Sequence, residues 1–236
     1  MPGARGLRGD GPGGVSVAAS RDAILSGPGG SPPAKGPIAI PNDLERDDLL
    51  GRFRRAGALL EGHFRLSSGL HSGGYLQCAL VLQDPREAGA LGSALAARVR
   101  ALTPSVVLSP ALGGIVIGHE VARALGVRAI FAERSAPPGA GLTLRRGFEL
   151  APGDRVLVVE DVLTTGKSTR ETIEVARASG AQVVGAAAIV NRSGGAVDLG
   201  VPFHALLDVS LPTYDPAACP LCAQGLPAVK PGSRPG

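Results

Sequence analysis

The chain has 236 residues, of which 44% are hydrophobic and 3% aromatic, and its formal net charge is +4 at pH 7. The net positive charge lies in residues 1–42 and 223–236, so the section between them is neutral. A nucleic-acid-binding domain carries its positive charge on a folded face, and a membrane-spanning helix needs roughly 18 consecutive apolar residues. Neither feature is present in the sequence, so we expect a cytoplasmic protein without nucleic-acid or membrane partners.

The two ends of the chain differ in composition from its middle. Residues 1–42 contain ten glycines and seven prolines and show no apolar periodicity. Burial in such a segment cannot offset the entropy of ordering it. We therefore predict a disordered tail over 1–42, a folded domain over 43–222 and a flexible tail over 223–236. Three cysteines without a secretory signal indicate a reducing compartment.

The predicted elements begin with a helix, for which Asn42 and Glu45 form a capping box. Apolar residues then recur at helical spacing, at Leu49, Leu50, Phe53 and Leu60. A glycine-rich segment over 62–75 leads into a predicted strand at 75–82, and Pro85 begins a second helix that ends near Leu102.

From residue 106 onward, short apolar strands alternate with helices. The predicted strands are 106–109, 127–132, 155–160, 183–190 and 204–209, and the predicted helices are 115–125 and about 169–179. This alternation predicts an α/β fold, with a mainly parallel sheet and helices on both of its faces. Ligands bind such sheets at the carboxyl ends of the strands.

The most informative segment is the strand over 155–160 and the turn that follows it. The strand ends in two acids, Glu160 and Asp161, and a hydroxyl-rich turn over 164–168 precedes the next helix. Free backbone N–H groups and the helix dipole make such a turn an anion site. The turn suits a phosphate monoester, and the acids suit sugar hydroxyls or a divalent cation.

This segment has two other interpretations. Gly166-Lys167-Ser168 ends like a P-loop, but that motif needs a glycine where this chain has Asp161. The alternative without a ligand is a buried strand followed by an ordinary capped helix. Two acids at the end of an apolar strand are costly to bury without a use, so we favour the binding site.

Residues 158–168, Val-Val-Glu-Asp-Val-Leu-Thr-Thr-Gly-Lys-Ser, resemble the phosphoribosyl-diphosphate motif of type I phosphoribosyltransferases. The Thr-Thr-Gly form resembles the orotate branch of that family. In the same order as in that branch, 62–72 resembles its base-covering segment, 109–115 its diphosphate loop, and Arg192 its orotate-contacting arginine. The resemblance spans about residues 44–222 and looks closest to a Thermus-like subgroup.

The resemblance implies the type I phosphoribosyltransferase fold with a small N-terminal hood over the base. It implies transfer of phosphoribosyl from 5-phosphoribosyl 1-diphosphate to orotate, which yields orotidine 5′-monophosphate and diphosphate in pyrimidine biosynthesis. It also implies a homodimer and Mg²⁺ as cofactor, held mainly through the substrate and not by a protein metal site.

The implied roles fall on a few residues. Glu160 and Asp161 are expected to be catalytic, and Thr164 and Arg192 to bind orotate, because the planar fork of arginine matches a carboxylate. A solvated loop arginine is the alternative for Arg192. The residues expected to bind phosphoribosyl diphosphate are Glu160, Asp161, Val162, Leu163, Thr164, Thr165, Gly166, Lys167, Ser168 and Arg134.

The chain departs from the family pattern around the diphosphate. Gly113 stands where the family often has lysine, and Ser67 where it commonly has lysine or arginine. The loop over 131–148 lacks the usual lysines and histidine, so its only cations are Arg134, Arg145 and Arg146. Arginine cannot donate a proton at neutral pH, so we expect this loop to act by charge alone.

The sequence leaves two questions open, the activity of the protein and the state of one cysteine pair. The protein acts on orotate or on another nucleobase, or it is a non-catalytic regulator that senses nucleotides on the same fold. Cys219 and Cys222 form a lone Cys-x-x-Cys pair. A structural Zn²⁺ needs four ligands, so reduced thiols are favoured over a zinc site completed by dimer symmetry.

Overall fold

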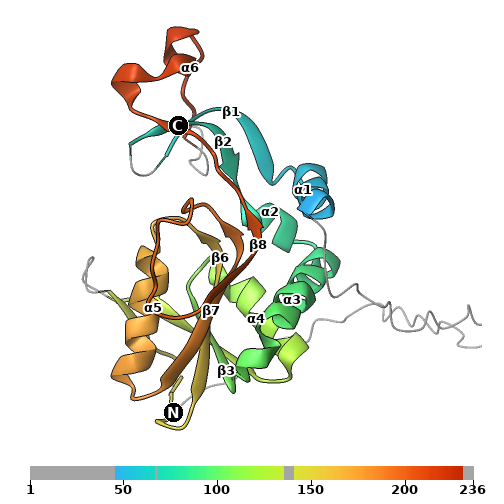
Figure 1. Cartoon of the computed structure of the whole chain (residues 1–236), viewed down its shortest axis with the longest axis vertical. Helices are drawn as coiled ribbons and strands as arrows, with labels where there is room; N and C mark the ends of the chain where they lie inside the picture. Colours follow the sequence, from blue (N-terminus) through green and yellow to red (C-terminus); the bar gives the residue numbers. More distant parts are fainter. Residues whose placement is uncertain (1–45, 67–68, 136–140, 231–236) are drawn as a thin grey trace, which may run out of the picture. The chain divides into compact units, whose positions relative to one another are not determined.

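A computed structural model describes residues 46–66, 69–135 and 141–230 (Figure 1). The predicted tail over 1–42 and the predicted cap at Asn42 and Glu45 lie outside these residues. No helix within the described ranges is long and apolar enough to cross a membrane.

The larger sheet has six strands in the order β5-β4-β3-β6-β7-β8. β3, β4, β6, β7 and β8 pair in parallel, and β5 is antiparallel to β4. Their bounds are β3 Val106–Pro110, β4 Arg128–Arg134, β5 Leu142–Leu144, β6 Arg155–Leu163, β7 Gln182–Asn191 and β8 Phe203–Asp208. The predicted parallel sheet is therefore confirmed.

Helices cover both faces of this sheet (Figure 1). On one face, α3 (Pro85–Val99) and α4 (Gly114–Leu125) pack over an apolar core that includes Leu157 and Ile189. On the other face, α5 (Lys167–Ala178) packs over a second core that includes Val158 and Ala188. Successive side chains of a strand point to opposite faces, so β6 and β7 supply both cores and are almost wholly buried.

A second, three-stranded antiparallel sheet has the order β1-β2-β9. β1 (Leu59–Arg65) and β2 (His71–Leu76) form a hairpin, and β9 (Thr213–Tyr214) joins β2 through the pair His71 and Tyr214. The chain continues through η2 (Pro216–Ala218) and α6 (Pro220–Ala223). This sheet corresponds to the hood that the family resemblance implies.

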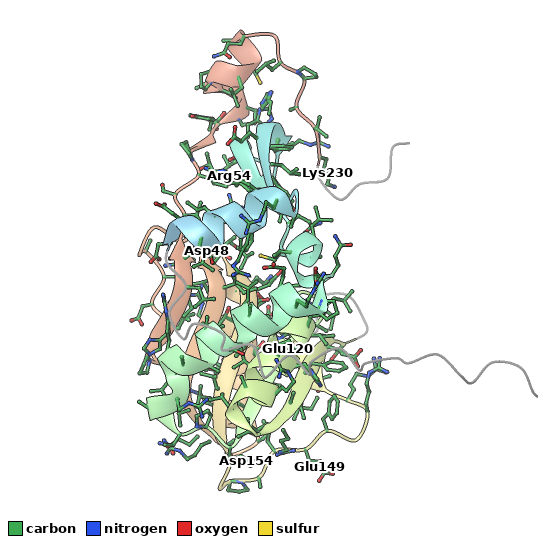
Figure 2. All side chains as sticks on the ribbon, turned by 90° about the vertical axis from the view of Figure 1, so that its right-hand side faces the viewer. Asp48, Arg54, Glu120, Glu149, Asp154 and Lys230 are labelled. Atoms are coloured by element: carbon green, nitrogen blue, oxygen red, sulfur yellow. The ribbon has the colours of Figure 1, made fainter. Side chains whose placement is uncertain are left out.

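The C-terminal segment departs from the predicted tail over 223–236. Val229 forms a bridge with Phe64 of β1, and its backbone bonds to His63 and Arg65 at 2.8 and 2.9 Å. Lys230, the last described residue of the chain, lies beside the small sheet (Figure 2). The described part of the tail is thus hydrogen-bonded to β1.

Two predicted elements differ from the structure. The predicted helical run through Leu60 ends earlier, since α1 spans Arg46–Arg55 and Leu60 belongs to β1. Gly57, with a φ of 64°, reverses the chain between them. The predicted strand at 75–82 is the end of β2 followed by the short helix α2 (Cys78–Leu82). The second predicted helix is confirmed as α3 with the 3-10 turn η1 (Arg100–Leu102).

Candidate active site

The acid pair lies near the carboxyl end of β6, among buried residues. The strand continues three residues past its predicted end at Glu160, because β7 stays paired with it as far as Leu163 and Asn191. Glu160 is 6% exposed, and its Oε2 accepts a hydrogen bond of 2.7 Å from Ser168 Oγ. Asp161 Oδ1 accepts a bond of 2.8 Å from the backbone N–H of Val162.

Burial sets the protonation of both acids. It raises the pKa of Glu160 to about 8, the Ser168 hydroxyl opposes that rise, and the neighbouring Asp161 adds to it. Burial also raises the pKa of Asp161. Two adjacent carboxyls that resist ionisation favour a cationic or hydroxyl partner, since either compensates their lost hydration.

The turn between β6 and α5 has the shape of an anion site. Gly166 adopts a φ of 73° at the N-cap of α5, and a Cβ there would lie 2.6 Å from Val197 Cγ1. Only glycine fits this position. Thr164 and Thr165 are exposed, and the Thr165 hydroxyl accepts a hydrogen bond of 3.4 Å from the backbone N–H of Lys167 at the start of α5. The N–H groups of a first helical turn lack carbonyl partners within the helix, which suits them to an anion.

Leu163 differs from the other residues predicted to bind phosphoribosyl diphosphate. Its side chain is 1% exposed and belongs to the core beneath α5. Its carbonyl accepts a hydrogen bond of 2.7 Å from the backbone N–H of Arg192. Leu163 therefore holds Arg192 in place and offers no side-chain atom to a ligand.

The loop between β3 and α4 packs directly against the acid pair. A Cβ at Gly113 would lie 2.8 Å from Asp161 Oδ1, and one at Gly114 would lie 2.9 Å from the Val159 carbonyl oxygen. The Ala111–Leu112 peptide of this loop is cis. The close approach explains why Gly113 carries no side chain here, and it places the predicted diphosphate loop beside Asp161.

Arg192 follows β7 on a loop that hydrogen bonds hold in place. Asn191 Oδ1 accepts bonds of 3.0 and 2.8 Å from the backbone N–H and the hydroxyl of Ser193, and Asn191 Nδ2 donates to Asp208 at 2.7 Å. The Nε atom of Arg192 is buried and has no hydrogen-bond partner among the described residues. Burial lowers the pKa of its guanidinium. A desolvated, unsatisfied cation fits an anionic ligand.

Cys78, a residue that the sequence did not single out, lies between the acid pair and Arg192. Burial raises the pKa of its thiol well above the ordinary value, and Asp161, Arg192 and Glu160 all act on it electrostatically. Tyr75 and Cys78 in turn act on Arg192. The end of β2, the start of α2, the acid pair and Arg192 therefore converge. The sequence did not indicate a role for Cys78, because this residue lies within an apolar run.

Of the three candidate cations in the loop over 131–148, Arg134 and Arg146 form ion pairs and Arg145 is an exposed residue. Arg134 ends β4, and its Nη1 lies 2.5 Å from Glu171 Oε2 in the first turns of α5, close to the anion-binding turn. Arg146 follows β5, which runs back from the carboxyl end, and it forms bonds of 2.9 and 2.8 Å to Glu133. The structure thus ties Arg134 to α5, the helix that follows the turn over 164–168, and ties Arg146 to Glu133 of β4.

Comparison with known proteins gives the same class as this geometry. A family model described as "Phosphoribosyl transferase domain" matches residues 81–200. The matched region contains β3, β6 and the anion-binding turn, so the class defined by the fold and the site is that of the phosphoribosyltransferases.

Two curated relatives of this chain belong to one group of phosphoribosyltransferases, those that act on orotate. An orotate phosphoribosyltransferase of Pelotomaculum thermopropionicum is 56% identical over 191 residues, which are 81% of this chain and 99% of that protein. One from Novosphingobium aromaticivorans is 54% identical over 191 residues, which are 80% of this chain and 97% of that protein. The chain belongs to the orotate phosphoribosyltransferase family.

Solved structures agree with this assignment. The orotate phosphoribosyltransferase of Aeropyrum pernix superposes with a TM-score of 0.59 at 28% identity, covering 68% of this chain and 93% of that one. The Mycobacterium tuberculosis orotate phosphoribosyltransferase in complex with 5-phospho-α-D-ribosyl 1-diphosphate gives a TM-score of 0.54 at 26% identity, covering 69% and 95%.

Proposed function

We propose that this chain transfers the phosphoribosyl group of 5-phosphoribosyl 1-diphosphate to N1 of orotate. The bond from C1′ to the diphosphate oxygen breaks, and the electron pair leaves with diphosphate. A bond forms from N1 to C1′, and the proton of N1 passes to the leaving diphosphate. The observation that carries the proposal is the buried Nε of Arg192, which has no partner among the described residues and which converges with Glu160 and Asp161 at Cys78.

Each part of the site has a proposed task. The turn over 164–168 binds the 5′-phosphate, and the loop over 110–114 offers backbone N–H groups to the diphosphate. Glu160 and Asp161 hold the ribose hydroxyls, while Arg192 and Thr164 orient orotate through its carboxylate and ring. Positive charge develops at the ribose as the bond to diphosphate breaks, so fixed carboxylates beside the sugar stabilise that charge.

The acid pair also fits a substrate-bound Mg²⁺ ion. Two adjacent buried carboxyls with raised pKa values gain most from a hard divalent cation, for which carboxylate oxygens are suitable ligands. We propose that Glu160 and Asp161 would face a Mg²⁺ ion held mainly by the substrate. When bound, the ion neutralises charge on the leaving diphosphate.

The proposal extends to the assembly and its location. We propose a homodimer in the cytoplasm, as the family resemblance implies. Sedimentation of the purified protein tests the dimer directly: a species of one chain mass at assay concentrations would contradict it.

A direct assay tests the proposed reaction. Purified protein with Mg²⁺ and phosphoribosyl diphosphate should consume orotate, as followed by its ultraviolet absorbance, and release diphosphate in equal amount. Uracil, adenine and hypoxanthine serve as competing bases in parallel reactions. Turnover of one of these in preference to orotate would contradict the proposal, as would nucleotide binding without turnover.

Arg134 provides a test of the diphosphate side. Arg134→Ala should raise the KM for phosphoribosyl diphosphate roughly tenfold, because one charge-assisted hydrogen bond is worth about 1.5–3 kcal/mol and this side chain is half exposed. The KM for orotate should change little. Steady-state kinetics at fixed ionic strength measure both values.

Arg123→Ala is the matched control, because Arg123 is half exposed and pairs with Glu120 in the last turns of α4, where α4 packs against Gly89 of α3. The control should keep the wild-type KM for both substrates. If Arg134→Ala behaved like the control, Arg134 would serve only its ion pair with Glu171.

A further inference from the structure

Four side chains that the proposed reaction does not use meet at the small sheet. His63 lies on β1 and His71 on β2. Cys219 directly precedes α6, and Cys222 lies within it. Their ligand atoms all lie within 4.8 Å of one another. We propose that these four residues, the His2Cys2 cluster, bind one structural Zn²⁺ ion.

The distances within the cluster are close to those of a tetrahedral zinc site. His63 Nε2 lies 3.5 Å from Cys219 Sγ and 3.8 Å from Cys222 Sγ, and His71 Nδ1 lies 3.3 Å from Cys222 Sγ. Tetrahedral zinc, with Zn–N of about 2.0 Å and Zn–S of about 2.3 Å, sets nitrogen and sulfur about 3.5 Å apart. The two ring nitrogens, 2.8 Å apart, need to separate by about 0.5 Å.

Hydrogen bonding prepares one of the rings for a metal. His63 Nδ1 lies 2.7 Å from the carbonyl oxygen of Leu226. A carbonyl oxygen only accepts, so Nδ1 carries the ring proton and Nε2 presents its lone pair to the cluster. A ligating histidine whose other ring nitrogen donates to a carbonyl is the usual arrangement at metal sites.

Burial favours a closed, structural site. His63, His71 and Cys219 are 5%, 8% and 4% exposed, whereas Cys222 is an exposed residue. Three buried ligands leave little room for a substrate, and the exposed fourth gives an ion a path from solvent. Two thiols and two imidazoles are a ligand set that zinc prefers.

The C-terminal segment lacks an apolar core of its own. Over residues 212–230, Cys219 is the one buried residue, and Tyr214 and Leu221 are half-buried. Ordering 19 residues costs conformational entropy that so little burial cannot offset. Zinc binding supplies folding free energy directly in such segments. The ion would hold this segment against the β1–β2 hairpin.

The cluster also removes the need for a partner subunit. The Cys-x-x-Cys pair offers two ligands, and His63 and His71 of the same chain complete the four. The proposal is therefore an intrachain site, in place of the expected reduced thiols without metal.

Cobalt substitution tests the site without relying on enzyme activity. The reduced full-length protein, stripped of metal with a chelator, should bind one Co²⁺ per chain. It should then show the visible bands of tetrahedral cobalt together with sulfur-to-cobalt charge transfer, and Zn²⁺ should displace the colour. The protein as purified should contain one zinc per chain by elemental analysis.

Variants assign the ligands. Cys222→Ser should lose most of the charge-transfer intensity and bind cobalt at least tenfold more weakly, and the pair Cys219→Ser with Cys222→Ser should abolish both. His119→Ala and Cys78→Ser change a histidine and a cysteine outside the cluster, so their zinc content should equal that of wild type.

Amide hydrogen exchange locates the effect. Metal removal should speed exchange in β1, β2 and 213–229 and leave β6 and α5 protected. A reduced wild-type protein that gives no tetrahedral cobalt spectrum would overturn the proposal, whatever the folding of the variants. So would a full complement of zinc in the double cysteine variant.

Discussion

Arg192→Ala is expected to lower kcat/KM for orotate by about 2–5 kcal/mol, which corresponds to roughly thirty-fold or more. The Nε atom of Arg192 is buried without a partner among the described residues, and burial lowers the pKa of its guanidinium. An anionic ligand would accept a hydrogen bond from this Nε and would compensate the charge of the buried guanidinium. Arg192→Lys should recover only part of the loss, because an ammonium cannot form two parallel bonds to a carboxylate.

Product binding isolates the carboxylate contact. Wild type should bind orotidine 5′-monophosphate more tightly than uridine 5′-monophosphate, which lacks the carboxylate, and Arg192→Ala should bind the two nearly equally. Arg177→Ala, which removes an arginine paired with Glu174 in the last turn of α5, is the control. A preference for the carboxylated nucleotide that survives in Arg192→Ala would reject the assignment.

Glu160→Gln is expected to reduce kcat on the order of a hundredfold and yet to stabilise the unliganded protein at high pH. The folded-state pKa of Glu160 is about 8, above its ordinary value of 4.5. Between these values the native state binds more protons than the unfolded state, so stability falls as the pH rises through this window. Glutamine cannot ionise, so this loss is absent in the variant.

The expected gain is largest at high pH. It should be near zero below pH 4.5 and reach on the order of 4 kcal/mol at pH 8, given about 1.4 kcal/mol per pKa unit over the rise from 4.5 to about 8. Denaturant unfolding of both proteins at a series of pH values measures it. Glu149→Gln, at an exposed glutamate near Asp154 and so at the end of β6 opposite to Glu160 (Figure 2), should follow wild type. A pH-independent difference would show that Glu160 ionises normally.

The sequence predicted the central sheet well because its strands are short apolar runs between helices. β6 is the best case: a run from Val156 to Val159 ends in Glu160 and Asp161, and the cost of burying two acids there favoured a ligand site over a plain strand end. Its end was misplaced by three residues, since pairing with β7 and not composition sets how far the strand extends.

The hood was predicted poorly for a related reason. The run Leu76–Leu82 is apolar enough for a strand or a buried helix, and periodicity cannot separate the two in so short a segment. Leu59 and Leu60 continue a helical spacing, but Gly57 ends the helix, and the hairpin partner β2 turns them into a strand.

The His2Cys2 cluster could not be assembled from spacing alone. His63 and Cys219 are separated by 156 positions. Neither the histidine pair nor the cysteine pair by itself supplies the four ligands of a structural zinc site. A signal was available, since two of the four histidines flank the hairpin and two of the three cysteines form Cys-x-x-Cys. Their meeting depends on β9 pairing with β2, which the sequence does not indicate.

The pairing of β9 with β2 has a consequence for how the protein is made. Synthesis runs from the N-terminus, so β6, β7 and the anion-binding turn leave the ribosome before residues 213–229 do. The β1–β2 hairpin, although made first, waits for its third strand and for both cysteines until the last part of the chain emerges. The nascent chain thus acquires the turn that we propose binds the 5′-phosphate before the small antiparallel sheet is complete.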